Sequence, residues 1–130
     1  MNKVFDISKF ETVDTAQLVV QNPKGGELIG ADGVNPVVIN LYGMGSKQYV
    51  NAKYKLDNAN QVRSIAMLRN NKAPKPEDVA KDEAEFLAAV TQSIENFPIE
   101  PIALYSNPKL GYIKAQVDKF VGDTENFIQF

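Results

Sequence analysis

The chain has 130 residues and a formal net charge of −2 at pH 7, and it contains neither Cys nor His. This length fits one compact domain that needs no disulfide or structural metal to hold its core together. Without those two residue types, thiolate chemistry and imidazole or thiolate metal sites are excluded, and carboxylates, Lys, Tyr and backbone groups remain for catalysis. We therefore expect a protein that is not an enzyme and that uses no cofactor or metal.

The charge balance and hydropathy also limit where the protein acts. A sequence pI of about 5.1 gives no general attraction to nucleic acid or to an anionic membrane surface. No apolar run approaches the roughly 20 residues of a membrane-spanning helix, and the first residues lack the pattern of a signal peptide. These patterns predict a cytosolic protein.

The first third of the chain predicts a small antiparallel β-meander of about three strands between residues 15 and 42. Segments 16–20 and 36–42 are rich in β-branched residues, and segment 27–30 is a candidate return strand. Turn-forming residues lie between these segments. A sheet this small needs helices packed on its apolar face to be stable.

The rest of the chain predicts those helices, because apolar residues recur there at intervals of three and four. The first helix begins after Ser46, a candidate N-cap, and carries a stripe that includes Val62 and Ala66. The last helix is followed by Gly122 at the place of a left-handed C-cap. The predicted helices span about 46–70, 77–96 and 108–121, with a helical turn at 101–105. The expected fold is α+β, in a single domain over residues 1–130.

Charge separates by helix. Residues 47–75 hold seven basic residues and one acidic residue, whereas residues 77–100 hold seven acidic residues and one basic residue. Either the two helices form a hairpin within one chain, or an acidic face of one subunit meets a basic face of the next. The charged faces considered for assembly contain Lys53, Lys55, Arg63, Arg69, Asp78, Asp82 and Glu85.

Two local patterns suggest chemistry only weakly. The stretch 43–46, Gly-Met-Gly-Ser, lies between a strand and a helix, but it lacks the third glycine of a dinucleotide fingerprint and the Gly-Lys of a P-loop. We interpret it as a hinge. The carboxylates of the second helix pair with Lys81 at i,i+4 spacing and predict a solvated or partner-facing surface, not a metal site.

The chain ends on an apolar tail, residues 123–130, that contains Phe127, Ile128 and Phe130. Termini are usually polar and frayed, so this tail either packs back onto the domain or docks on another chain.

Two stretches carry a family resemblance. Residues 39–49 combine a strand, a glycine and a helix start of the form Ser-x-x-Tyr, and residues 104–121 end in a helix with Gln116-Val117-x-x-Phe120, followed by Asn126-Phe127. This pattern, over about a third of the chain, resembles the tail assembly chaperones of bacteriophages with long, non-contractile tails.

The resemblance implies a non-enzymatic protein of the host cell cytoplasm that is absent from the mature virion. Such a chaperone binds the tape-measure protein, prevents its aggregation and is displaced as the major tail protein polymerises. The chain would be the short product of a frameshifted gene. Its partners would then be the tape-measure protein, the longer form of itself, the major tail protein through that form, and further copies of itself.

We hypothesise that one apolar set contributes to client binding or self-association: Leu110, Ile113, Val117, Phe120, Phe127 and Phe130. The main alternative function is a head–tail joining protein or another component of the virion. A glycosidase that uses paired carboxylates is a distant third.

Overall fold

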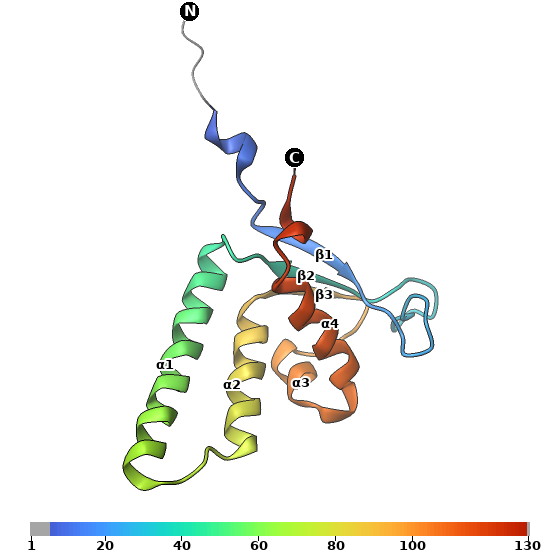
Figure 1. The fold of residues 1–130 in the computed structure, drawn as a ribbon. Coiled ribbons are helices and arrows are strands. Elements are labelled where there is room, and N and C mark those ends of the chain that lie inside the picture. The colour runs from blue at the N-terminus through green and yellow to red at the C-terminus, as the bar shows by residue number, and fades with distance from the viewer. Residues whose placement is uncertain (1–5, 130) are drawn as a thin grey trace, which may run out of the picture.

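The structure is a computed structural model that describes residues 6–129. Three strands and four α-helices follow one another in these residues, and Figure 1 shows the sheet above two groups of helices. In chain order the elements are β1 (Thr15–Val19), β2 (Val38–Tyr42), α1 (Lys47–Asn70), α2 (Pro76–Ala89), β3 (Thr91–Glu95), α3 (Pro101–Ser106) and α4 (Gly111–Val121). The short 3-10 helices are η1 (Ile7–Phe10), η2 (Pro108–Leu110) and η3 (Thr124–Phe127). The predicted α+β class is confirmed.

The sheet is antiparallel in the order β1-β2-β3, with β2 in the centre. Ile39 and Leu41 of β2 are completely buried against the helices, while Asn40 between them points to the opposite face. The Asn40 amide donates hydrogen bonds to Ser93 Oγ at 2.8 Å and to a Glu95 carboxylate oxygen at 3.0 Å. One face of the sheet is therefore apolar and the other is polar.

The third strand comes from a place where the sequence predicts helix. The predicted helix 77–96 ends at Ala89, and residues 91–95 pair with β2 instead. The Thr91 hydroxyl donates to the Leu87 carbonyl at 2.8 Å, which closes the last turn of α2, and Thr91 and Ile94 favour an extended backbone. The spacing of Val90, Ile94 and Phe97 imitates a helical stripe, so the period alone gave the wrong prediction.

The predicted strand 27–30 is also corrected. In the structure this segment makes only two isolated bridges, Gln21 with Glu27 and Ile29 with Pro36. Gly25, Gly26 and Gly33 on either side have positive φ, so the chain turns too tightly to continue a ladder. The sheet thus combines two strands of the predicted meander with one strand from between the helices.

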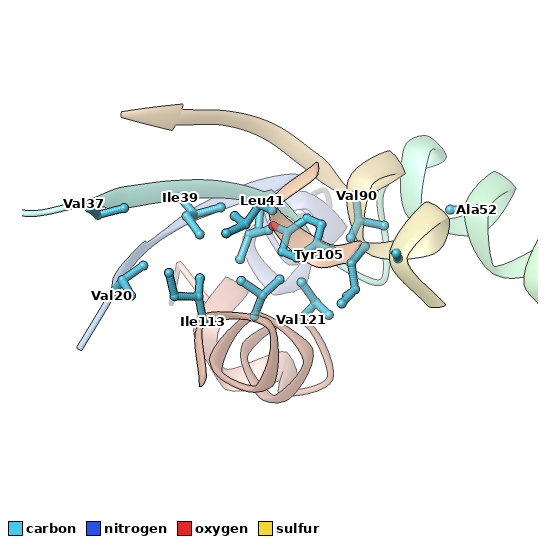
Figure 2. Close-up of a cluster of buried hydrophobic side chains, with 13 residues drawn as sticks. Val20, Val37, Ile39, Leu41, Ala52, Val90, Tyr105, Ile113 and Val121 are labelled. Atoms are coloured by element: carbon cyan, nitrogen blue, oxygen red, sulfur yellow. The ribbon is translucent and has the colours of Figure 1, made fainter. Parts of the chain in front are cut away.

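The core lies between the inner face of the sheet and the helices (Figure 2). Ile113 and Val121 of α4 lie below the strand residues Val37, Ile39 and Leu41, and Tyr105 of α3 fills the space toward α2. The remaining core residues are Val20, Ala52, Ala84, Leu87, Val90, Leu104 and Val117. α1 contributes only Ala52 to this core, so most of that long helix lies outside it.

Candidate functional site

α1 and α2 form a helical hairpin within the chain, as one of the two sequence-based alternatives predicts. An ion pair between Arg63 and Asp82 joins the two helices, and both side chains are mostly buried. Nearer the sheet, the Tyr49 and Phe86 rings meet edge to face, with their centroids 5.4 Å apart. The basic helix and the acidic helix therefore attract each other inside one molecule at this point.

The other charged residues of the predicted assembly faces make few such contacts. Lys53 pairs with Asp57 of its own helix at 3.3 Å. In residues 6–129 the exposed side chains Lys55, Arg69, Asp78 and Glu85 have no ion pair. They remain available to a partner.

The Ser46 side chain sets the start of α1. Its hydroxyl accepts a hydrogen bond from the Tyr49 amide at 3.2 Å and donates to the Gly43 carbonyl at 2.7 Å. The predicted N-cap and hinge are therefore observed, and Ser46 is buried at this bend. At the other end, Asn71 adopts a left-handed conformation and its amide donates to the Met67 carbonyl at 2.8 Å.

α1 is longer than the helix that covers it. Its 24 residues rise about 36 Å, compared with about 21 Å for the 14 residues of α2. Every residue from Ser64 to Asn70 is exposed, and we call this segment the free end of α1. Val62 and Ala66 were predicted to belong to the buried stripe, but both are exposed because α2 does not cover them.

The side of α1 that points away from the core carries several large apolar residues. Val50, Tyr54, Gln61, Ile65 and Leu68 lie within about 60° of arc around the helix, opposite the core-facing Ala52 and Leu56. We define the outer face as the apolar members of this set together with the adjoining Val62: Val50, Tyr54, Val62, Ile65 and Leu68. Leu68 is 84% exposed and Tyr54 is 68% exposed. Single exposed apolar residues are ordinary, whereas five along one helix face typically mark an interaction site.

A cleft of about 450 Å³ lies between α1, α2 and α4. Leu56, Phe86 and Val121 supply apolar walls, and an ion pair between Lys114 and Glu83 at 3.2 Å spans its rim. The cleft offers room for an apolar side chain. The described residues that line it include no Ser, Thr, Cys or His, and its polar side chains are Tyr49, Lys53, Glu83, Lys114 and Asp118.

The apolar residues predicted to bind a client are mostly core residues. Ile113 and Val117 are 0% exposed and Phe127 is 2% exposed, so in this fold they offer no surface to a partner. Leu110 and Phe120 are partly buried against the same core. Phe130 lies outside the described residues. The helical spacing that suggested a binding stripe is the spacing of a helix packed on a sheet.

The C-terminal tail packs back onto the domain through Phe127. Its ring meets Phe120 edge to face at 5.6 Å, and its carbonyl accepts a hydrogen bond from the Val13 amide at 2.8 Å. A β-carbon added to Gly43 would lie 2.6 Å from a ring carbon of Phe127, so only glycine fits there. Gly43 therefore makes room for the tail, and the loop 43–46 is a bend that packs against the Phe127 ring.

Two polar clusters in the fold have structural roles. The Tyr105 hydroxyl is 2.7 Å from Thr91 Oγ1, and burial raises the pKa of Tyr105 to about 12. Asp32 accepts hydrogen bonds from the backbone amides of Val34 and Asn35 and from the Asn96 side chain, which together hold its pKa well below its usual range. No cluster of three or more carboxylates suited to a metal ion occurs in the described part of the chain.

The outer face of α1 was not predicted from the sequence. The signal was present, because this helix contains more large apolar residues than one stripe can use. Assigning Tyr49, Ala52, Leu56 and Ala59 to the core leaves Val50, Tyr54, Ile65 and Leu68 on the opposite side.

Within residues 6–129, no helix is both long enough and apolar enough to cross a membrane. No protein-family model, curated protein or solved structure matches the chain.

Proposed function

We propose that the chain is a tail assembly chaperone of a bacteriophage with a long, non-contractile tail, which binds the tape-measure protein without catalysing a reaction. The outer face of α1 is the observation that supports this function best. A small domain with a complete core gains nothing for its own stability by exposing Leu68 and Val62 to water. A second helix that lies along this face would bury them, as amphipathic helices do in helix-in-groove complexes.

The sequence resemblance supports the same proposal from residues that do not lie on that face. The Gly43 and Ser46 pattern forms the bend before α1, and the Asn126-Phe127 pattern fixes the tail against this bend. These residues hold α1 at a defined position relative to the core. As a chaperone, the chain would act in the host cytoplasm and be absent from the finished particle.

Co-expression with the tape-measure protein of the same genome tests this function. We expect the tape-measure protein to aggregate when made alone, and to stay in solution and co-purify with the chain when both are made. If the chain changes neither its solubility nor its recovery, the proposed function is wrong.

Mass spectrometry of purified particles separates this function from that of a head–tail joining protein. A chaperone is absent from the particle, whereas a joining protein is present. The nucleotide sequence at the last codons provides an independent check, because a slippery heptamer with an overlapping frame is expected there.

A further inference from the structure

We infer that the outer face of α1 binds an amphipathic helix of a second protein whose apolar stripe is bordered by Asp and Glu. This inference rests on the proposed function only for the biological identity of that protein. It follows from the basic residues along one border of the outer face, which form no ion pair among residues 6–129.

One border of the outer face is basic. Lys47 and Arg69 lie on or beside this side of the helix, and Lys55 lies at its edge toward α2, where it lines a hollow with Asp82 and Glu85. All three cations are exposed, and none has an ion pair among residues 6–129. On the opposite border, Lys53 is already neutralised by Asp57. Lys72 and Lys75 in the loop after the free end add further positive charge. Carboxylates on one side of an apolar partner helix would meet cations without ion pairs near both ends of this border.

A second copy of this chain does not match that surface. Two α1 helices placed face to face would bring Lys47, Lys55 and Arg69 of both copies close together, and like charges at such distances repel. The acidic α2 of another copy supplies carboxylates, but none of the large exposed apolar residues in the described chain belongs to α2. The complementary partner therefore carries both features on one helix.

Nucleic acid matches the charge but not the chemistry of the surface. Val50, Val62, Ile65 and Leu68 would lie against phosphates and sugars, and Tyr54 is the only aromatic residue of the outer face that could stack on a base. The distance from Val50 to Leu68 is about 27 Å along the helix, which matches a partner helix of about five turns.

The test uses three synthetic helical peptides of about three heptads, each with a Leu stripe bordered by Glu, by Gln or by Lys. Binding to the full chain is measured by fluorescence anisotropy at low and moderate salt. We expect the Glu peptide to bind at least about tenfold more tightly than the Gln peptide, the preference to shrink as salt rises, and the Lys peptide not to bind.

Substitutions in the chain then locate the site. Ile65→Gln with Leu68→Gln should weaken the Glu peptide by at least about tenfold, because both side chains are exposed and their loss leaves the core intact. Lys55→Glu with Arg69→Glu should transfer the preference to the Lys peptide. Val34→Gln is the matched control, since Val34 is 76% exposed in a loop distant from α1 in the sequence, and it should change nothing. Thermal unfolding of each variant confirms that the fold is kept.

Four results overturn the inference. The first is equal binding of the three peptides, and the second is unchanged binding of the Glu peptide by the Ile65→Gln/Leu68→Gln variant. The third is a dimer of the chain that this variant disrupts and that the Glu peptide does not displace. The fourth is binding of oligo-dT that depends on Lys55 and Arg69 but not on Leu68. If the Glu peptide binds as expected and the tape-measure protein does not, the surface is assigned correctly and the proposed function is wrong. If the tape-measure protein is kept in solution equally well by the Ile65→Gln/Leu68→Gln variant, the function stands and this surface is not its site.

Discussion

The contact between Gly43 and Phe127 permits a quantitative test of where the C-terminal tail lies. A β-carbon at Gly43 would be 2.6 Å from the Phe127 ring, well inside van der Waals distance, so Gly43→Ala forces the ring to move. Overpacking of this kind costs about 1 to 3 kcal/mol in the free energy of unfolding. Phe127 is 2% exposed, and Phe127→Ala should cost about 3 to 5 kcal/mol.

The double variant tests whether residues 43 and 127 are in direct contact. Once Phe127 is replaced by Ala, the new methyl group at position 43 has space, and the loss of glycine flexibility in the unfolded chain becomes neutral or slightly stabilising. Gly43→Ala with Phe127→Ala should therefore be about as stable as Phe127→Ala alone. The resulting coupling energy is about 1 to 3 kcal/mol, within the range found for residues in contact.

Urea unfolding followed by circular dichroism measures all four proteins. The expected pattern is two destabilised single variants and a double variant that is no worse than Phe127→Ala. If the tail docked on another chain, both single substitutions would change the unfolding midpoint little and their effects would add. Additive losses would therefore refute the packing described here.

Three further predictions concern polar contacts. Arg63→Ala removes the only ion pair described between α1 and α2 and leaves the mostly buried Asp82 carboxylate without its partner, so it should cost about 1 to 2 kcal/mol in urea unfolding. A cost equal to that of Lys53→Ala would contradict this role. The pKa of Tyr105 is about 12 in the folded chain and about 10 when unfolded, so its contribution is complete below pH 10 and is lost between pH 10 and 12. The stability difference between the parent and Tyr105→Phe should fall by about 2 to 3 kcal/mol over that range, and a constant difference would exclude the effect. Since the folded pKa of Asp32 is lowered, its hydrogen bonds stabilise the loop above about pH 4 and weaken as the pH falls further. The protection of the Val34 amide from hydrogen exchange, measured relative to its unstructured rate at the same pH, should therefore fall in acid in the parent, and be low and independent of this titration in Asp32→Ala.

The sequence predicted the parts of the fold that local chemistry determines. Ser46 caps α1 because a serine hydroxyl can satisfy an amide of the first turn, and the prolines at 76 and 108 begin helical segments because their φ is already suitable. Strand β3 was missed because Thr91 and Ile94 become strand residues only when β2 offers an unpaired edge. That requirement comes from tertiary structure, and no window along the chain contains it. The expected left-handed cap at Gly122 was also wrong, since its φ is −80°.

The candidate site was harder to predict, because burial decides which apolar stripe is core. Val117 and Leu68 both lie at helical spacing from other large apolar residues of their own helix, yet Val117 is completely buried and Leu68 is 84% exposed. The difference arises from neighbours: α4 lies under the sheet, and the end of α1 extends past α2. Helix length gives a partial signal, since a helix ten residues longer than its hairpin partner must leave about 15 Å uncovered.

The free end of α1 keeps its shape through contacts made elsewhere on the helix. Seven residues in water would not form a stable helix by themselves, because nucleation costs more than so few hydrogen bonds return. Here the helix is already nucleated by Ser46 and held by Ala52 and by the ion pair of Arg63, so the last turns only propagate it. The outer face is therefore presented to a partner as a preformed helix, and binding does not bear the cost of ordering it. It follows that Arg63→Ala should weaken partner binding as well as the fold, although Arg63 points away from the outer face.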